Sequence, residues 1–276
     1  MMCFLRIITA FVYLTFISMY DIFIFEMRIK IMRNDYKDFS YVYDSLIDDV
    51  DYKNLLDRML KICKKYSHKP KLVLDAACGT GNFTKELVNK GFDVIGVDSS
   101  AEMLAVAQNK LCGKCAFICQ DLCELDLYGT INTVFCTLDS LNHITNFELL
   151  KKAVARMSLF LEPGGLMFFD VNTIYKHKNV LANNIFVEEK ENIYMVWQNT
   201  LDNNTVNINM DFFVEEDGLY ERLSENFYER AYSDEELKEV LDYAGLEVLE
   251  TEDFYSGGAV SENSEKVIYT VRKKEK

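Results

Sequence analysis

Basic residues are scarce in this 276-residue chain relative to acidic ones. It contains 30 Lys and Arg against 44 Asp and Glu, which gives a formal net charge of −14 at pH 7. A net negative charge repels the phosphate backbone and disfavours non-specific electrostatic binding to nucleic acid. Small molecules, or a protein, are therefore the expected partners.

The chain also has few prolines and lacks a secretory cleavage signal. There are only two prolines, and no small-residue cleavage site stands out near the N-terminus. Eight cysteines in such a chain predict reduced thiols in a cytoplasmic protein rather than a disulfide framework. No internal repeat is visible, and 49% apolar residues suffice for one large domain with an elaboration.

Residues 1–31 form a hydrophobic extension that differs from the rest. Ile7 to Tyr20 is uncharged and largely apolar, and Asp21 interrupts it. Because a membrane helix needs about 20 consecutive apolar residues, this run is marginal as a span. Either this segment anchors the main domain on the cytoplasmic side of a membrane, or translation starts at Met32 and the preceding residues are not part of the functional protein. We favour the second interpretation and expect membrane association only through residues 1–31.

Residues 34–276 have the pattern of an α/β domain. Strand-like and helical stretches alternate, which predicts a Rossmann-like, mostly parallel seven-stranded sheet with helices on both faces. The expected strands of this sheet are 72–74, 92–97, 115–119, 132–138, 166–171, 246–254 and 266–271, and the expected helices are 82–90, 101–111, 147–161 and 233–245.

Residues 174–231 break this rhythm. After a short helical stretch at 174–181 come three runs rich in aromatic and β-branched residues, 193–201, 205–214 and 219–231. Turn residues at 202–204 and 216–218 separate them, which indicates hairpins. We predict an antiparallel β-meander inserted after strand five that covers the substrate pocket.

The stretch Leu72–Asn82 reads L-V-L-D-A-A-C-G-T-G-N and organises the domain. Gly79 and Gly81 fall where a buried strand reverses into a helix, so the backbone can adopt positive φ and a ligand can approach the helix amides. A dinucleotide motif would have a third glycine where this chain has Thr84, which weakens that interpretation.

Acidic residues follow four of the expected strands. They are Asp75, Asp98, Asp121 and Asp139. In parallel sheets, ligands bind at the carboxyl ends of the strands, and an acid roughly 20 residues past the glycines is placed to bind ribose hydroxyls. Asp98 has that position.

Leu74–Asn82 resembles the first motif of the class I S-adenosylmethionine-dependent methyltransferases in its L-D-x-A-C-G-T-G form. The resemblance extends from about Tyr36 to Lys273, includes the turn at 163–165, and departs from the common pattern at Ala77, where glycine is usual. It implies S-adenosylmethionine as cofactor and methyl transfer as activity.

The resemblance also implies roles for individual residues. Asp75 would face the amino end of the cofactor, and Asp98 would bind both ribose hydroxyls. Met103 and Leu122 would pack against the two faces of the adenine ring, with Asp121 near its exocyclic amine. The cofactor-binding residues implied are Asp75, Ala77, Gly79, Gly81, Asp98, Met103, Asp121 and Leu122.

The acceptor side is less defined, because methyl transfer is an in-line attack on an activated carbon and a dedicated base is optional. We expect Asp139, His143 and Tyr43 to position the acceptor rather than to act as acid or base.

We expect no metal site. The four cysteines that could suggest one do not form paired C-x-x-C motifs; they are Cys112, Cys115, Cys119 and Cys123.

The main hypothesis is methylation of a small molecule. The alternatives are an RNA or protein methyltransferase and a non-catalytic module that binds the cofactor. Against RNA stand the net charge and the absence of an N-P-P-Y motif in Leu138–Asn142. The sequence does not reveal the oligomeric state.

Overall fold

The computed structural model describes Asp44, residues 50–190 and residues 192–275. The hydrophobic extension at 1–31 and Tyr43 lie outside the described residues, so the predictions made for them stay predictions. Within the described ranges, no helix is both long and apolar enough to cross a membrane.

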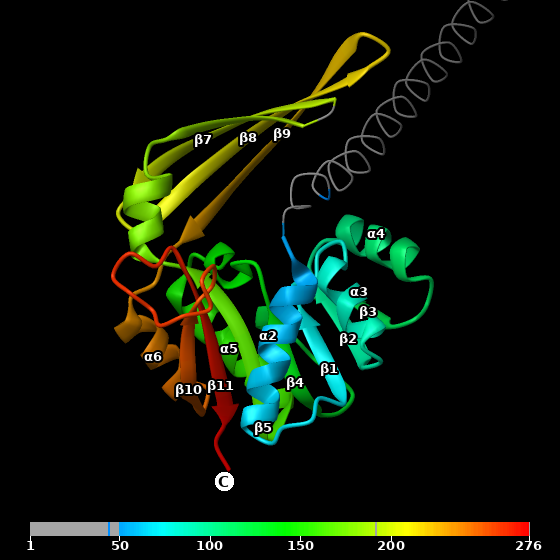
Figure 1. Ribbon diagram of the computed structural model, residues 1–276, viewed down its shortest axis with the longest axis vertical. Helices are drawn as coiled ribbons and strands as arrows, with labels where there is room; N and C mark the ends of the chain where they lie inside the picture. The colour runs from blue at the N-terminus through cyan, green and yellow to red at the C-terminus, as the bar shows by residue number, and fades with distance from the viewer. Residues whose placement is uncertain (1–43, 45–49, 191, 276) are drawn as a thin grey trace, which may run out of the picture. The chain divides into compact units, whose positions relative to one another are not determined.

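The main sheet has seven strands in the order β10-β11-β5-β4-β1-β2-β3 (Figure 1). Its elements are, in chain order, α2 (Tyr52–Lys65), β1 (Leu72–Ala76), α3 (Asn82–Asn89), β2 (Asp93–Asp98), α4 (Ala101–Leu111), β3 (Ala116–Cys119), η1 (Leu122–Glu124), β4 (Ile131–Cys136), η2 (Ser140–His143), α5 (Phe147–Phe160), β5 (Leu161–Asn172), α6 (Asp234–Tyr243), β10 (Leu246–Asp253) and β11 (Lys266–Lys273). Strands β1 to β5 pair in parallel, and β11 is antiparallel to both β5 and β10. The expected fold class is confirmed.

Apolar clusters cover both faces of this sheet. On one face, α2 and α3 pack on the strands through Leu56, Met59 and Leu87. On the other face, α5 and α6 pack through side chains that include Leu150 and Leu237. Burial on both faces explains why the parallel strands read as continuous apolar runs.

Local signals set the helix starts. Ser100 caps α4 by accepting a hydrogen bond from the Met103 amide, and Ser233 forms a reciprocal capping box with Glu236 at α6. Strand β5 begins at Leu161, five residues before the expected start at residue 166. The early start arises because Leu161 already pairs with Ile131 of β4, before a register shift in the β4–β5 pairing. The expected short helix at 174–181 is present as η3 (Lys176–Leu181).

A second sheet follows η3 and has the order β6-β7-β8-β9. Its strands are β6 (Ile185–Lys190), β7 (Ile193–Asp202), β8 (Thr205–Glu216) and β9 (Leu219–Arg230). The three expected strands and both hairpin turns are present, and all neighbours are antiparallel. The sequence prediction missed β6, because this edge strand is mostly exposed and lacks a buried alternate face.

Candidate active site

The glycine turn joins β1 to α3. Gly79 and Gly81 have φ of +53° and +78°, and Ala77 has φ of +56°. An added Cβ at Gly79 would meet no atom within 4 Å, whereas one at Gly81 would lie 3.0 Å from the Cβ of Ala107. Gly79 thus leaves open space for a ligand, and Gly81 permits close packing of the turn on α4. The left-handed backbone at Ala77 explains why glycine is common there.

Asp98 ties the turn to the end of β2. Its Oδ2 accepts a hydrogen bond from the Gly79 amide at 2.8 Å, and its Oδ1 accepts one from the Ser100 amide at 2.8 Å. A carboxylate oxygen has two lone pairs, so each oxygen of Asp98 can still accept a hydroxyl. The arrangement fits an acid that binds the two ribose hydroxyls of a nucleoside.

Asp75 lies beneath the turn and is 1% exposed. Burial raises the pKa of its carboxyl to about 7, and the nearby charge of Asp98 also raises it, although a hydrogen bond from Thr84 opposes the shift. The Thr84 hydroxyl donates to Asp75 Oδ2 at 2.5 Å. Thr84, which occupies the third-glycine position of a dinucleotide motif, thus links α3 to β1.

Replacement of Thr84 by Val should destabilise the protein by about 1–2 kcal/mol at pH 8, because the fully buried Asp75 loses its hydrogen-bond donor. Because the native pKa of Asp75 is raised to about 7, its carboxyl is protonated in the native state at pH 5 and ionised at pH 8, and only the ionised form depends strongly on the hydrogen bond from Thr84. The loss in T84V should therefore be smaller at pH 5. Urea unfolding at both pH values measures this effect, with T130V at an exposed threonine as control; an equal loss at both pH values would contradict it.

Asp44 braces the turn, and the sequence prediction missed this role. Its carboxylate accepts hydrogen bonds from the Thr80 hydroxyl, from Asn82 Nδ2 and from Lys110 Nζ. These contacts join the turn, the first residue of α3 and α4. No local motif at Asp44 signals them, because its nearest partner is 36 residues away in the chain.

The residues expected around adenine follow β2 and β3. Met103 is half-buried in the first turn of α4, and Leu122 is buried at the start of η1. Asp121 is exposed and caps η1 by accepting a hydrogen bond from the Cys123 amide at 2.7 Å. These positions are compatible with the expected roles, which stay predictions.

The segment after β4 is strained and held by a buried acid. Leu138 and Asp139 are consecutive non-glycine residues with φ of +58° and +51°. Their two amides donate to the two carboxylate oxygens of Asp170 at 2.7 Å each. Such adjacent amides form an anion-binding nest, which here holds a fully buried side chain of β5.

Lys266 of β11 lies between two of these acids. Its Nζ is 2.6 Å from Asp139 Oδ1 and 3.6 Å from Asp170 Oδ1. Burial by itself would raise the pKa of Asp139, but the charges of Lys266 and Lys176 outweigh it and hold that pKa well below its ordinary value. Burial alone would likewise lower the pKa of Lys266, and the two acids hold it above its ordinary value. Asp139 is thus ionised at neutral pH.

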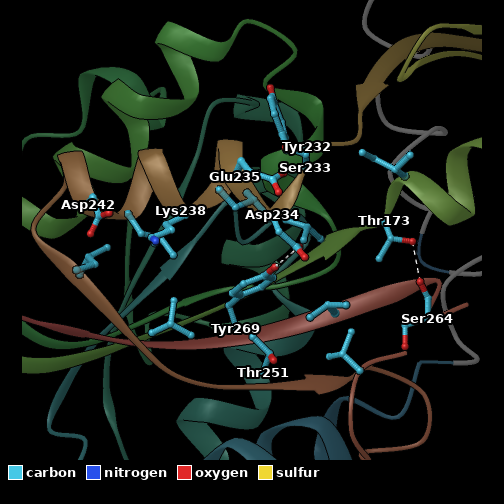
Figure 2. Close-up of a pocket in the computed structure, with 18 of the residues that line it drawn as sticks. Thr173, Tyr232, Ser233, Asp234, Glu235, Lys238, Asp242, Thr251, Ser264 and Tyr269 are labelled. Carbon is cyan, nitrogen blue, oxygen red and sulfur yellow. Dashed lines mark hydrogen bonds between the residues drawn. The ribbon is translucent and has the colours of Figure 1, made fainter. Parts of the chain in front are cut away.

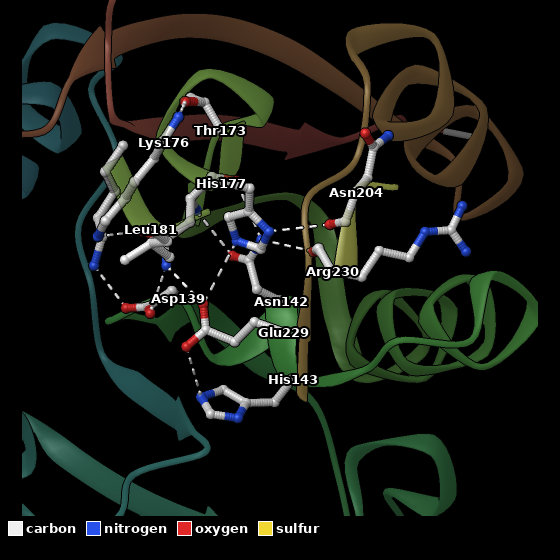
Figure 3. A network of polar contacts seen from close by, with 12 residues as sticks. Asp139, Asn142, His143, Thr173, Lys176, His177, Leu181, Asn204, Glu229 and Arg230 are labelled. Atoms are coloured by element: carbon white, nitrogen blue, oxygen red, sulfur yellow. Dashed lines mark hydrogen bonds and ion pairs between the residues drawn. The ribbon is translucent and has the colours of Figure 1, made fainter. Parts of the chain in front are cut away.

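Glu229 of β9 completes the arrangement and was not identified from the sequence (Figure 3). It is 5% exposed, and its Oε2 accepts a hydrogen bond from Asn172 Nδ2 at 2.9 Å. The same Asn172 amide donates to Asp139 Oδ2 at 2.8 Å. Glu229 Oε1 lies 3.9 Å from Nε2 of His143, whose side chain is 46% exposed. The second sheet therefore delivers a buried carboxylate to the ends of β4 and β5.

Asp139, His143 and Glu229 could also be considered as metal ligands, because one ligand atom from each lies within 4.8 Å of the others. Lys266 already places an ammonium group on Asp139, however. The seven described cysteines are free thiols, and none of them joins this group.

A cavity of about 890 Å³ lies elsewhere, between α6, β10 and β11 (Figure 2). Asp234 and Tyr269 contact each other in it, with 3.3 Å between the hydroxyl and the carboxylate. None of the residues expected to bind the cofactor or to position the acceptor lines this cavity.

Comparison with known proteins agrees with this geometry. Residues 73–165 match the model of a family described as a methyltransferase domain. A protein of Geobacillus sp. (strain WCH70) whose name assigns it to the methyltransferases is 33% identical over 248 residues, which cover 86% of this chain and 99% of the relative.

Solved structures extend the comparison. An S-adenosylmethionine-dependent methyltransferase from Clostridium acetobutylicum has a TM-score of 0.81 at 34% identity, covering 87% of this chain and 99% of that one. An amino pentose methyltransferase from Micromonospora echinaspora, solved with S-adenosylmethionine bound, has a TM-score of 0.70 at 19% identity over 84% of this chain and 96% of that one, and shows the shared fold. The chain therefore belongs to the class I S-adenosylmethionine-dependent methyltransferases.

Proposed function

We propose that this methyltransferase acts on a small-molecule acceptor, bound between the carboxyl ends of β4 and β5 and the second sheet. The observation that carries the proposal is the position of His143. Its half-exposed ring packs against Phe227 of β9 at 5.1 Å between centroids and lies 3.9 Å from Glu229. An acceptor at this face would meet polar groups from both sheets.

The cofactor, S-adenosylmethionine, would be held by the eight residues named from the sequence. Bound there, it supplies a methyl group that is activated by a positive sulfur. In this proposal the Gly79–Gly81 backbone, Asp75 and Asp98 bind its polar parts, and Met103, Asp121 and Leu122 surround adenine. Asp139 is already bonded to Lys266 and Asn172, so it orients neighbouring groups and does not accept a proton. Tyr43 stays a prediction on the acceptor side.

Two further observations support a small acceptor. The formal charge of −14 disfavours nucleic acid, and the amino pentose methyltransferase with the same fold acts, by its name, on a sugar. The site is also built from a few polar groups on rigid elements, as is usual for small-molecule sites.

Transfer of tritium from labelled S-adenosylmethionine tests the proposal. A cell extract is separated into small molecules, RNA and protein, and each fraction is incubated with the enzyme. We expect label in the small-molecule fraction, and none when the D98A variant replaces the wild type. Label only in RNA or protein would overturn the proposal, as would no label in any fraction while the wild type binds S-adenosylhomocysteine.

A further inference from the structure

The acidic groups on the acceptor side outnumber the cationic ones. The acceptor-side cluster consists of Asp139, His143, Asp170, Lys176, Glu229 and Lys266. Its three carboxylates face two ammonium groups, and neither ammonium group forms an ion pair with Glu229 within 4 Å, although Lys176 interacts with it at longer range. Lys266 contacts Asp139 and Asp170, and the Lys176 ammonium donates to Asn172 Oδ1 at 2.9 Å.

Glu229 is the carboxylate left without a full positive charge. Among the described residues, the basic groups within 4 Å of its carboxylate are His143 at 3.9 Å and His177 at 3.7 Å, both beyond hydrogen-bond distance, and Lys176 acts on it only from further away. A buried carboxylate is costly unless it is paired or hydrogen-bonded. Glu229 has one such bond, from Asn172, and its Oε1 faces the half-exposed His143.

His177 provides a second, independent sign that a positive group is missing here. Its side chain is fully buried, and its Nδ1 lies 3.0 Å from the Asn204 carbonyl oxygen, so Nδ1 carries the hydrogen. Its Nε2 has no hydrogen-bond partner and points at Glu229 Oε2 (Figure 3). At 3.7 Å the two atoms are beyond hydrogen-bond distance, so His177 donates no hydrogen bond to Glu229.

We infer that the acceptor is an amine, recognised in its ammonium form by Glu229 and deprotonated by His143, which in this inference acts as a base and departs from the positioning role expected from the sequence. The inference rests on the proposed function, because it names the substrate class of the same site. An ammonium ion brings the missing positive charge together with N–H donors. A carboxylate or thiolate acceptor would be repelled by the excess negative charge, and a neutral hydroxyl would leave Glu229 uncompensated.

The spacing of the cluster favours an ammonium ion over a metal ion. Two acceptors bridged by one ammonium nitrogen, with hydrogen bonds of about 2.8 Å, lie about 4.0–4.6 Å apart. Two ligands of a tetrahedral ion at about 2.1 Å lie about 3.4 Å apart. The separation of 3.9 Å between His143 Nε2 and Glu229 Oε1 is closer to the first value.

The chemical step balances with these groups. The bound ammonium transfers one proton to Nε2 of His143 and becomes a neutral amine, while Glu229 pairs with the imidazolium. The amine lone pair then forms a C–N bond to the methyl carbon as the C–S bond breaks, and the bonding pair stays on sulfur. The products are a methylated ammonium ion and a neutral thioether.

A binding experiment tests recognition without turnover. The chain has three histidines, so the ring signals of His143, His177 and His68 can be assigned from single His variants by NMR. Ethylammonium chloride is titrated into the protein with S-adenosylhomocysteine at constant ionic strength, with ethanol as the uncharged counterpart. We expect saturable shifts of the His143 signals with ethylammonium, none with ethanol, and no change at His68, which contacts Thr133.

Substitutions in β9 test whether Glu229 is the group that binds ethylammonium. E229Q should weaken the ethylammonium response at least 10-fold and leave S-adenosylhomocysteine binding unchanged, whereas E221Q, at an exposed glutamate of the same strand, should behave as the wild type. An equal response to ethanol, an undiminished response in E229Q, or a response of His143 to manganese chloride but not to ethylammonium would overturn the inference.

Turnover separates this inference from the proposed function. Tritium transfer is measured for matched pairs such as glucosamine with glucose and ethanolamine with ethylene glycol. Label in the amines alone supports the inference. Label in hydroxyl compounds alone overturns the inference and leaves the proposed function standing, whereas ethylammonium binding with no label in any small molecule overturns the proposed function.

Discussion

Replacement of Asp98 by Ala should weaken the binding of S-adenosylhomocysteine about 100-fold. In the proposed complex Asp98 contributes two charge-assisted hydrogen bonds to ribose hydroxyls, worth about 1.5 kcal/mol each. Their joint loss of about 3 kcal/mol corresponds to about two orders of magnitude in Kd. Asp98 also holds the Gly79 amide at 2.8 Å, so the turn loses its anchor on β2.

Isothermal titration calorimetry with S-adenosylhomocysteine measures the effect. D98N retains one acceptor oxygen and should lose about 10-fold, which corresponds to about 1.4 kcal/mol. D93N, at an exposed position at the start of the same strand, is the matched control and should bind as the wild type. Binding by folded D98A within threefold of the wild type would show that Asp98 does not hold the cofactor.

The glycine turn and its contacts with Asp75 and Asp98 were predictable from the sequence because these residues lie close together in the chain. Asp98 and Gly79 are 19 residues apart, and Thr84 and Asp75 are nine apart. One β-α-β unit therefore carries most of the turn. The glycines and the apolar strand leave a local pattern that sequence analysis can detect.

The cluster at the ends of β4 and β5, where we propose that the acceptor binds, depends on contacts that no local pattern reports. Lys266 is 127 residues from Asp139, and Glu229 is 57 residues from Asn172. Asp170 reads as part of an apolar strand, although it holds two backbone amides. Glu229 sits in the run Leu219–Arg230, where exposed glutamates are frequent. Only the pairing of the second sheet shows which of these glutamates is buried.

Replacement of Lys266 by Met should destabilise the protein by about 3–5 kcal/mol at pH 7.5, because it leaves Asp139 and the fully buried Asp170 without their shared cation. Methionine fills a similar volume, so a cavity contributes little. The surface pair of Lys90 and Asp57 offers a matched control, and K90M should cost less than about 1 kcal/mol because exposed ion pairs contribute little.

The pH dependence distinguishes loss of charge from loss of packing in K266M. Since the native pKa of Asp139 is lowered, its ionised form stabilises the wild type above the unfolded-state pKa, and that stabilisation is lost as the pH falls through the native value. Without Lys266, both acids become easier to protonate. The difference between the unfolding free energies of wild type and K266M, measured in urea from pH 7.5 downwards, should therefore become smaller as the pH falls towards 4. A difference that stays constant over this range would assign the loss to packing, and a difference below about 1 kcal/mol at pH 7.5 would show that Asp139 and Asp170 do not need Lys266.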